Sequence, residues 1–388
     1  MKEKHDYRAL PRDTLLGSLK LGASKGVDLL SHLQSQGVIA CLLILTSVAT
    51  AFLWCSSAAA QMDFLNGGRP LLDAHNCYPY DGQWNDRVSR ALHSGFPVSI
   101  EQDLAWYVDP ATGAGRIVVS HTPQPTGAEP TLRAYFFEQV RPVIEKALAE
   151  KKRDTWPVVV LHFDFKDNRP ELLKAVWQLL EEYEPWLSTA RKGTSAAELQ
   201  PLQKAPILVV TEDSDEQQKV FYDDVPIGAK LRLFGSAHTA ASPKLDKPEL
   251  MHWAATVSPE KLLKEKPTNY RRWWNSSWYT VEEGGQHNGR DWSATDDRRL
   301  RALVDHAHKM GFSIRFYTLD GFAAAKDQGW GQGYNFGSIE AVKVRWQAAV
   351  AAGVNFIATD QYEDLAPYLL QNSRELRNAD ASPLRRHR

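Results

Sequence analysis

The chain has 388 residues, and its 46 lysines and arginines nearly balance its 47 aspartates and glutamates, which gives a formal net charge of −1. Proteins that bind nucleic acid through a broad basic face usually carry a basic excess, so this balance argues against a nucleic-acid partner. Hydrophobic residues at 43% and charged residues at 24% are typical of folded globular domains, which excludes disorder over most of the chain. The length fits two domains or a single α/β barrel with insertions.

The N-terminal part of the chain differs in composition from the rest. Residues 1–36 form a polar, mildly basic region, and an uncharged apolar run at 38–54 lies within a predicted signal peptide or membrane anchor at 37–60. The run is shorter than the roughly 20 residues of a full membrane span, and the alanines at 58–60 suit a cleavage site. A cleaved export signal, an uncleaved anchor and an upstream start that adds extra residues all remain open. We expect export, with the protein secreted, periplasmic or membrane-anchored outside the cytoplasm.

Only one cysteine, Cys77, lies in the body of the chain, because Cys41 and Cys55 belong to the N-terminal segment. A lone cysteine cannot form an intradomain disulfide, so the body must be stabilised by its hydrophobic core. We therefore expect Cys77 to be a small buried hydrophobic residue.

From residue 69 onward, short apolar runs alternate with helical patterns. Strands are predicted at 70–75, 97–103, 116–121, 157–166, 206–210, 231–234, 312–318 and 354–359, and helices at 84–94, 132–152, 170–183, 295–310 and 338–352. Repeated strand–helix units indicate a parallel sheet, and seven or eight units in about 300 residues favour a TIM-type (β/α)8 barrel, possibly irregular. We place this barrel at 66–370 and expect the basic tail at 373–388 to be flexible.

Polar residues gather at the carboxyl ends of several predicted strands, where barrel enzymes carry their catalytic groups. His75 follows the first strand, Glu101 and Asp103 end the second, His121 ends the third, and Asp164 lies near the end of the fourth. A random distribution would not place polar side chains at the same end of separate strands. The sequence therefore predicts a polar site at this end of the barrel.

The residue types at these strand ends indicate metal-assisted phosphoryl chemistry. Residues two apart in a strand share a face, so Glu101 and Asp103 point the same way, as do Asp164 and Lys166. Carboxylates from two strands suit a hard divalent cation, Mg²⁺ or Ca²⁺, and a neighbouring lysine would neutralise an anionic substrate.

Two histidines from different strands, His75 and His121, suit an acid/base pair. A third, His162, shares the face of Asp164, and we expect it to form a structural hydrogen bond inside the barrel. Glu212, Asp213 and Asp360 follow other strands and are weaker candidates for the site.

An aromatic stretch at 271–289 contains three tryptophans and a Gly-Gly pair. We predict a loop here, in which Trp278 contacts the substrate. Trp273 and Trp274 are expected to pack on the exterior or the bottom of the barrel.

Several motifs resemble the phospholipase C-like phosphodiesterase superfamily, which includes glycerophosphodiester phosphodiesterases, phosphatidylinositol-specific phospholipases C and sphingomyelinase D-type enzymes. The similar segments are Asp73-Ala74-His75-Asn76, Ile100-Glu101-Gln102-Asp103, Val119-Ser120-His121, Asp164-Phe165-Lys166 and the glycine-led run at 353–360. The resemblance implies a TIM-like barrel with one divalent cation and acid/base catalysis.

By motif position, the resemblance makes His75 and His121 the acid/base pair and Lys166 a phosphate contact. It makes the three carboxylates metal ligands: Glu101, Asp103 and Asp164. Asn76, which stands where glycerophosphodiesterases usually have arginine, is taken as a further substrate contact.

The leading prediction is a metal-dependent phosphoric diester hydrolase acting on a phospholipid or a glycerophospho-alcohol. Its partners would be that substrate and a membrane, which it would reach through the N-terminal segment or at a lipid surface. No nucleic-acid partner is expected. One alternative is a barrel glycoside hydrolase with paired carboxylates such as Glu101 and Asp164. Another is a catalytically inactive, membrane-tethered binding protein.

Overall fold

The computed structural model describes residues 65, 69–79, 84–240, 243–289, 291–322 and 334–380. All of them belong to one compact unit, Ser56–Arg388, and the predicted segments 1–36 and 37–60 lie outside the described residues. The tail predicted at 373–388 begins inside helix α11, Tyr362–Asp380, and the rest of it is also outside them. Within the described ranges, no helix is both long and apolar enough to cross a membrane.

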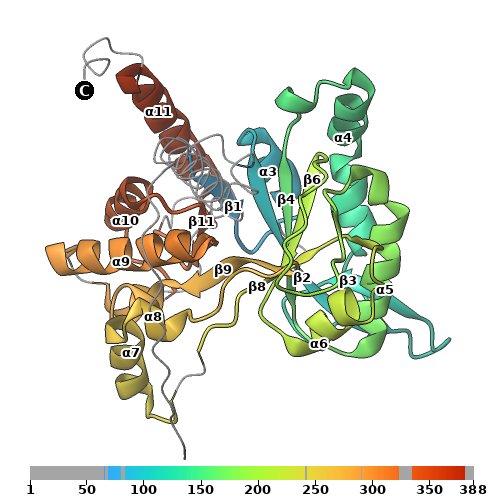
Figure 1. The fold of residues 1–388 in the computed structure, drawn as a ribbon, viewed down its shortest axis with the longest axis horizontal. Coiled ribbons are helices and arrows are strands. Elements are labelled where there is room, and N and C mark those ends of the chain that lie inside the picture. Colours follow the sequence, from blue (N-terminus) through green and yellow to red (C-terminus); the bar gives the residue numbers. More distant parts are fainter. Residues whose placement is uncertain are drawn as a thin grey trace, which may run out of the picture. The chain divides into compact units, whose positions relative to one another are not determined.

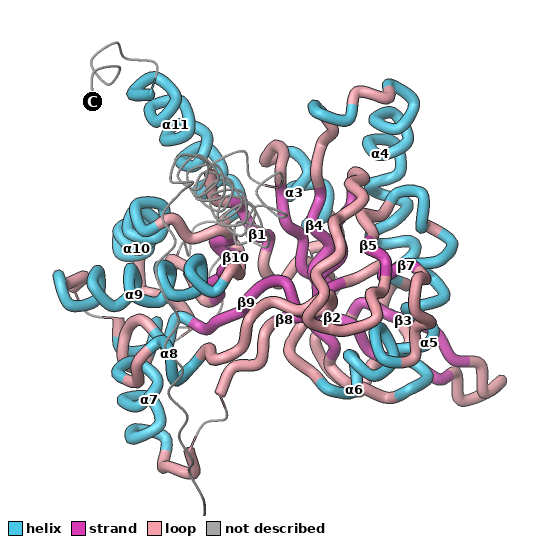
Figure 2. The backbone as a smooth tube through the Cα atoms, viewed as in Figure 1, coloured by secondary structure: helices cyan, strands magenta, loops and turns pink. Residues whose placement is uncertain are grey.

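Eight parallel strands close into a barrel, as the sequence predicts (Figures 1 and 2). Strand β1 pairs with β11 on one side and with β2 on the other, so the sheet has no free edge within the ring. In order around the ring the strands are β1 (Leu71–Ala74), β2 (Val98–Val108), β4 (Val159–Phe165), β6 (Ile207–Thr211), β8 (Phe234–Ser236), β9 (Arg271–Ser277), β10 (Ser313–Tyr317) and β11 (Phe356–Thr359).

Two predicted elements of the barrel were wrong. The third predicted strand, 116–121, is not a barrel strand: β3 (Gly115–Val119) forms an antiparallel hairpin with the long end of β2. The predicted aromatic loop instead begins with a barrel strand, β9. A separate pair, β5 (Ala190–Arg191) and β7 (Lys230–Leu231), forms a small antiparallel sheet.

Besides α11, the helices are α3 (Arg87–His93), α4 (Glu138–Glu150), α5 (Pro170–Glu182), α6 (Asp215–Gln218), α7 (Lys247–Thr256), α8 (Pro259–Leu262), α9 (Ala294–Met310) and α10 (Ile339–Ala352). They follow the strands and cover the ring; α9 and α10 lie on one side of it in Figure 1, and α4 and α5 on the other. Short π turns lie at Arg133–Phe137 and Lys219–Asp223, and short 3₁₀ turns at Arg153–Thr155, Glu184–Trp186, Trp278–Thr280 and Gly285–Asn288.

Helix α9 shows how local sequence sets these elements. Ser293 and Asp296 form a capping box at its start, and Gly311 ends it with φ of +99° in the left-handed region. Its buried apolar residues, Leu300, Leu303, Val304 and Ala307, recur at helical spacing and form one face against the barrel.

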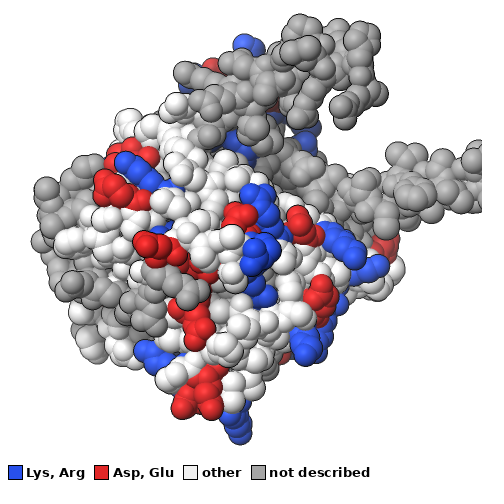
Figure 3. Space-filling view, turned by 90° about the vertical axis from the view of Figure 1, so that its left-hand side faces the viewer, with Lys and Arg blue, Asp and Glu red and all other residues white. Residues whose placement is uncertain are grey.

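On the side shown in Figure 3, acidic and basic side chains are interspersed on the surface.

The core is continuous between helices and strands, and Cys77 lies in it as a buried free cysteine, as expected. The interior near the carboxyl ends of the strands differs, because it is polar. Asp73, Glu101, His162 and Arg315 are all at most 4% exposed there. Parallel barrels usually fill this layer with branched apolar side chains, so these residues call for a chemical explanation.

Candidate functional site

The strand register brings the predicted carboxylates together. Glu101 on β2 pairs with His162 on β4, and Asp103 pairs with Asp164 two residues further along. Residues two apart share a face, so these side chains all project to the same side of the sheet. One oxygen from each of Glu101, Asp103 and Asp164 lies within 4.8 Å of the other two. We call these three residues the carboxylate cluster.

Lys166 contacts this cluster directly. Its Nζ lies 2.9 Å from Oδ2 of Asp103 and 2.7 Å from Oδ2 of Asp164. Burial alone would lower the pKa of Lys166, but the two aspartates raise it above its ordinary value, so the lysine stays charged. Burial and the neighbouring Asp103 raise the pKa of Asp164 to about 6, against the opposing effect of Lys166. The cluster therefore concentrates more negative charge than one lysine offsets.

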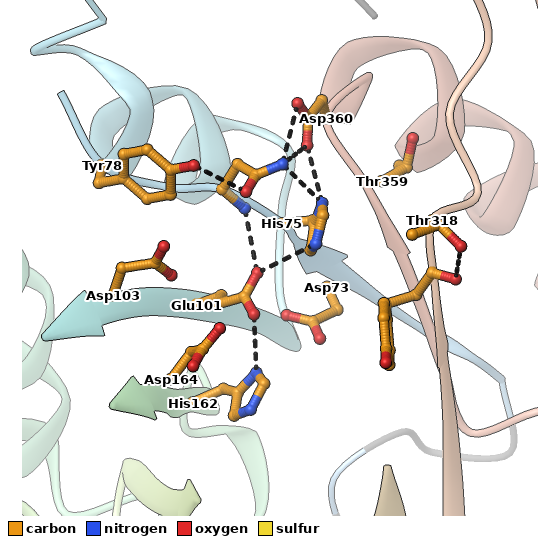
Figure 4. A network of polar contacts seen from close by, with 12 residues as sticks. Asp73, His75, Tyr78, Glu101, Asp103, His162, Asp164, Thr318, Thr359 and Asp360 are labelled. Carbon is orange, nitrogen blue, oxygen red and sulfur yellow. Dashed lines mark hydrogen bonds and ion pairs between the residues drawn. The ribbon is translucent and has the colours of Figure 1, made fainter. Parts of the chain in front are cut away.

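His75 lies between two groups of carboxylates (Figure 4). Its Nδ1 is 3.0 Å from Oδ1 of Asp360 and 4.0 Å from Oδ2 of Asp320, and its Nε2 is 3.6 Å from Oε2 of Glu101. Tyr362 fixes the backbone by donating its hydroxyl to the carbonyl of His75 at 2.7 Å. Although burial lowers the pKa of His75, Glu101 and then the two aspartates raise it to about 9.

Asn76 is buried and engaged with the site's own residues, and its contact with the substrate stays a prediction. Its backbone N–H donates to Oε2 of Glu101 at 3.0 Å, and its side-chain amide donates to Oδ1 of Asp360 at 3.0 Å. Its Oδ1 accepts from the hydroxyl of Tyr78 at 2.9 Å. With φ of +51°, Asn76 turns the chain so that backbone and side chain reach two carboxylates at once.

His121 reaches the same cluster from the β2–β3 hairpin. Ser120 N–H donates to the carbonyl of Asp103 at 2.9 Å, which holds the end of the hairpin against β2. The Nδ1 of His121 lies 2.7 Å from Oδ2 of Asp103, and its ring stacks on Tyr78 with centroids 5.3 Å apart. Its side chain is 55% exposed, in contrast to the 7% of His75. The two histidines therefore contact opposite members of the cluster, one buried and one open to solvent.

A second polar layer lies against the cluster. Nε2 of His162 donates to Oε1 of Glu212 at 2.6 Å, and the side-chain amide of Asn275 donates to both oxygens of Glu212 at 2.8 and 2.7 Å. Nη1 of Arg315 donates to Oδ1 of Asn275 at 2.9 Å, and its Nε donates to Oδ2 of Asp73. Burial and Arg315 lower the pKa of His162, but Glu212 and Glu101 bring it above its ordinary value.

The predictions for Trp278 and Trp273 were wrong, whereas Trp274 packs on the outer face of its barrel strand, as expected. Trp278 is fully buried and donates its Nε1–H to Oε2 of Glu282 at 2.7 Å, so it is a core residue and not a substrate contact. Trp273 points into the barrel, where its ring meets the ring of His162 edge-on at 4.9 Å. Trp274, on the opposite face of the strand, is fully buried and donates to Oγ1 of Thr239.

Sequence reasoning missed several residues of the site. Asp320 lies behind His75, and the ring of Tyr317 lies nearly parallel to that of His75 with centroids 6.4 Å apart. Both lie at or just after the end of the predicted strand at 312–318, so the strand-end rule offered a signal for them. Arg315 lies within the same strand and carried no such signal. Two of the weaker candidates contact histidines directly: Asp360 contacts His75, and Glu212 contacts His162. The third, Asp213, pairs with Arg271 and His238.

The carboxylate cluster fits a hard divalent cation. Three carboxylate oxygens from neighbouring strands are the donors that Mg²⁺ and Ca²⁺ prefer. Burial and then Asp103 raise the pKa of Asp164, and a cation bound between the three carboxylates would favour its ionised form. A second group, His75, Asp320 and Asp360, also converges within 4.8 Å.

No protein-family model matches the sequence, and no curated protein matches it. Among solved structures, the chain is similar to a glycerophosphoryl diester phosphodiesterase from Parabacteroides distasonis, at 11% identity over 80% of this chain and 91% of that one, with a TM-score of 0.37. A glycerophosphodiester phosphodiesterase from the same organism matches at 11% identity over 78% of this chain and 98% of that one, with a TM-score of 0.38.

A similarity of the same order joins the chain to an HPPK-DHPS from Plasmodium falciparum, at 8% identity over 79% of this chain and 47% of that one, with a TM-score of 0.40. The two Parabacteroides proteins carry the name of a group that the motifs of this chain resemble. At these identities and TM-scores the matches carry no weight for activity or substrate, which are argued below from the site alone.

Proposed function

We propose that the protein is a metal-dependent phosphoric diester hydrolase in which His75 and His121 act as the acid/base pair. One observation carries the proposal. Each histidine has its Nδ1 next to a carboxylate, Asp360 for His75 and Asp103 for His121, and the two rings contact different members of one carboxylate cluster. A carboxylate at Nδ1 fixes the ring and leaves Nε2 as the nitrogen that exchanges a proton with the substrate.

The environments of the two histidines suit different roles. Against the lowering effect of burial, Glu101 near Nε2 and Asp360 at Nδ1 raise the pKa of His75 to about 9 in the cation-free protein, a direction that suits a group placed to donate a proton to the leaving oxygen. His121 is solvent-exposed and accepts the proton of the nucleophile, which is either water or a neighbouring hydroxyl of the substrate. The second route would release a cyclic phosphate.

A divalent cation, Mg²⁺ or Ca²⁺, held by Glu101, Asp103 and Asp164 would supply Lewis-acid stabilisation of the charge on the phosphate. Lys166 holds Asp103 and Asp164 in place and adds a fixed positive charge beside them. The substrate we propose is a phospholipid or a glycerophospho-alcohol. The apolar run at 38–54 supports action outside the cytoplasm, after export or at a membrane.

The glycoside hydrolase alternative fits the site less well. It needs Glu101 as a nucleophile or base, but this carboxylate is only 5% exposed and both of its oxygens face cationic or N–H groups. It also gives no role to the two histidines. An inactive binding protein would keep the cation affinity but lack turnover, so an activity assay separates it from the proposal.

The test uses the full chain, stripped with EDTA and incubated with phosphatidylinositol, lysophospholipids and glycerophosphodiesters, with and without Mg²⁺ or Ca²⁺. Phosphorus NMR follows the products, and a variant with His121→Ala serves as the control. A cation-dependent product peak that the variant lacks is expected, and a cyclic phosphate would identify attack by the substrate's own hydroxyl. No product across the panel, although a cation binds, would reject the hydrolase and favour the binding protein.

A further inference from the structure

The two oxygens of Glu101 face different surroundings. Oε2 faces the site, where it accepts from the backbone N–H of Asn76 at 3.0 Å and lies 3.6 Å from Nε2 of His75. Oε1 faces the polar layer behind it, 3.4 Å from Nη2 of Arg315 and 3.7 Å from Nδ1 of His162. Figure 4 shows Glu101 between the two histidines. Glu101 is therefore held from both sides, and one of its oxygens still lies within 4.8 Å of an oxygen of Asp103 and of Asp164.

His162 is itself fixed by a chain of contacts that ends at the mouth of the barrel. Its Nε2–H donates to Glu212, whose side chain is 28% exposed and whose two oxygens are both held by Asn275. The ring is fully buried against the edge of Trp273. Because Nε2–H points at a carboxylate, which can only accept, the ring orientation is determined and Nδ1 must face Glu101.

A purely structural role does not explain this arrangement. His162 lies directly beside Glu101 across the β2–β4 pair, at an inward position where barrels usually carry branched apolar residues. Burying an imidazole and the carboxylates around it is costly unless every group is paired. Within the described residues, Nδ1 of His162 makes no hydrogen bond and lies 3.7 Å from Oε1 of Glu101. Core packing gives no reason to bury this unpaired nitrogen, whereas a role in orienting Glu101 does.

We propose that His162 is a positioning residue for Glu101, with Glu212 as its anchor: the pair holds the Glu101 carboxylate in the orientation in which it meets Asp103 and Asp164 around the cation. The inference rests on the proposed function, because it takes Glu101 as a cation ligand. Groups that hold the ligands of a metal typically change its affinity by about 10- to 100-fold when they are removed. His162 acts through Glu101 and is not expected to touch the substrate.

The experiment measures Mn²⁺ affinity of the EDTA-stripped full chain by electron paramagnetic resonance, with Mg²⁺ and Ca²⁺ as competitors. His162→Phe removes both ring nitrogens at similar volume, and we expect it to weaken Mn²⁺ binding about 10- to 100-fold. Glu212→Ala removes the anchor and should weaken binding in the same direction. Glu212→Gln, which keeps one oxygen that can accept from Nε2–H, should weaken binding less than Glu212→Ala.

Whether His162→Phe weakens or tightens Mn²⁺ binding distinguishes a positioning role of His162 from a purely electrostatic one. If His162 acted only as a nearby positive charge, its removal would favour a cation, and His162→Phe would tighten Mn²⁺ binding. His308→Ala is the matched control, because it removes a histidine that bonds Oδ1 of Asn355 away from the site, and it should leave affinity unchanged. Unchanged or tighter binding in His162→Phe and Glu212→Ala would overturn the inference.

The outcomes also separate this inference from the proposed function. If His162→Phe weakens binding but the wild type cleaves no phosphodiester, the positioning role stands and the hydrolase fails. If the wild type is active and both variants bind Mn²⁺ normally, only the positioning role fails. A wild type that binds none of the three cations overturns both. If His162→Phe does not fold, Glu212→Ala at the partly exposed mouth decides the question.

Discussion

Asp320 is a buried carboxylate whose ionisation should cost stability, and Asp320→Asn tests this. The side chain is fully buried, and its Oδ1 accepts from the N–H of Asp360 at 2.6 Å and from Thr359 at 3.0 Å. Its Oδ2 has no hydrogen-bond partner among the described residues and lies 4.0 Å from Nδ1 of His75. Burial, and then Asp360, raise the pKa of Asp320 from 3.8 to about 7, against the effect of His75.

The raised pKa sets the sign and the size of the effect. Between pH 3.8 and about 7, the folded protein keeps the proton on Asp320 while the unfolded chain releases it, so the free energy of unfolding falls as pH rises. The slope is about 1.4 kcal/mol per pH unit, which amounts to about 3 kcal/mol between pH 5 and pH 7. Asparagine at 320 keeps an oxygen for Asp360 and Thr359 but cannot ionise. The free energy of unfolding of the variant should therefore not show this fall with rising pH.

The assay is urea unfolding of the wild type and Asp320→Asn at about pH 5 and about pH 8. The difference in free energy of unfolding, variant minus wild type, should rise by about 3 kcal/mol from the lower to the higher pH. A constant destabilisation caused by the substitution itself does not affect this change. Asp305→Asn, at an exposed position, should show no such gain. Turnover should fall in Asp320→Asn, because His75 loses a neighbouring negative charge. A stability difference that is the same at both pH values would refute this reasoning.

Three further substitutions test the site and the fold. His121→Ala should lower turnover by about 10²- to 10⁴-fold while the thermal melt stays nearly unchanged, because the side chain is 55% exposed; substantial residual activity would remove His121 from the acid/base pair. Asp103→Asn should raise the Mg²⁺ or Ca²⁺ concentration for half-maximal rate by about tenfold or more, and an unchanged titration would exclude Asp103 as a ligand. Trp278→Ala should lower the free energy of unfolding in urea by about 3–5 kcal/mol, whereas Trp278→Phe should keep KM unchanged; a raised KM in that variant would return Trp278 to the substrate site.

Much of the site was predictable because a barrel brings strand ends together regardless of the details of its loops. His75, Glu101, Asp103 and Asp164 each follow or end an apolar run, and period-two alternation gives the face on which each points. Three of the four lie on two strands that are adjacent and in register, so local pattern and topology agree. The distances between them, and the part played by Lys166 as their ion-pair partner, needed the structure.

The missed strand β9 shows where pattern reasoning fails. Arg271, Trp273 and Asn275 share the inward face of this strand. Two of them are polar and form hydrogen bonds there: Arg271 donates to Asp213, and Asn275 bonds Glu212 and Arg315. A strand with a polar inward face has no apolar alternation to detect, so the segment resembles a loop. His121 was misplaced on a barrel strand because an antiparallel hairpin and a barrel strand have the same short apolar pattern.

Charge balance in the cluster supports the proposed diester, rather than a monoester, as substrate. Three carboxylates, Glu101, Asp103 and Asp164, would be offset by Lys166 and one divalent cation, which leaves no net charge to attract a further anion. Among the described residues, His75 lies next to the cluster on the side of the site, with its Nε2 3.6 Å from Glu101, and Asp360 at its Nδ1 favours the protonated ring. One imidazolium matches the single charge of a phosphodiester, whereas a monoester dianion would bring a second charge beside Asp320 and Asp360. The charges around His75 thus support the proposed diester as the substrate.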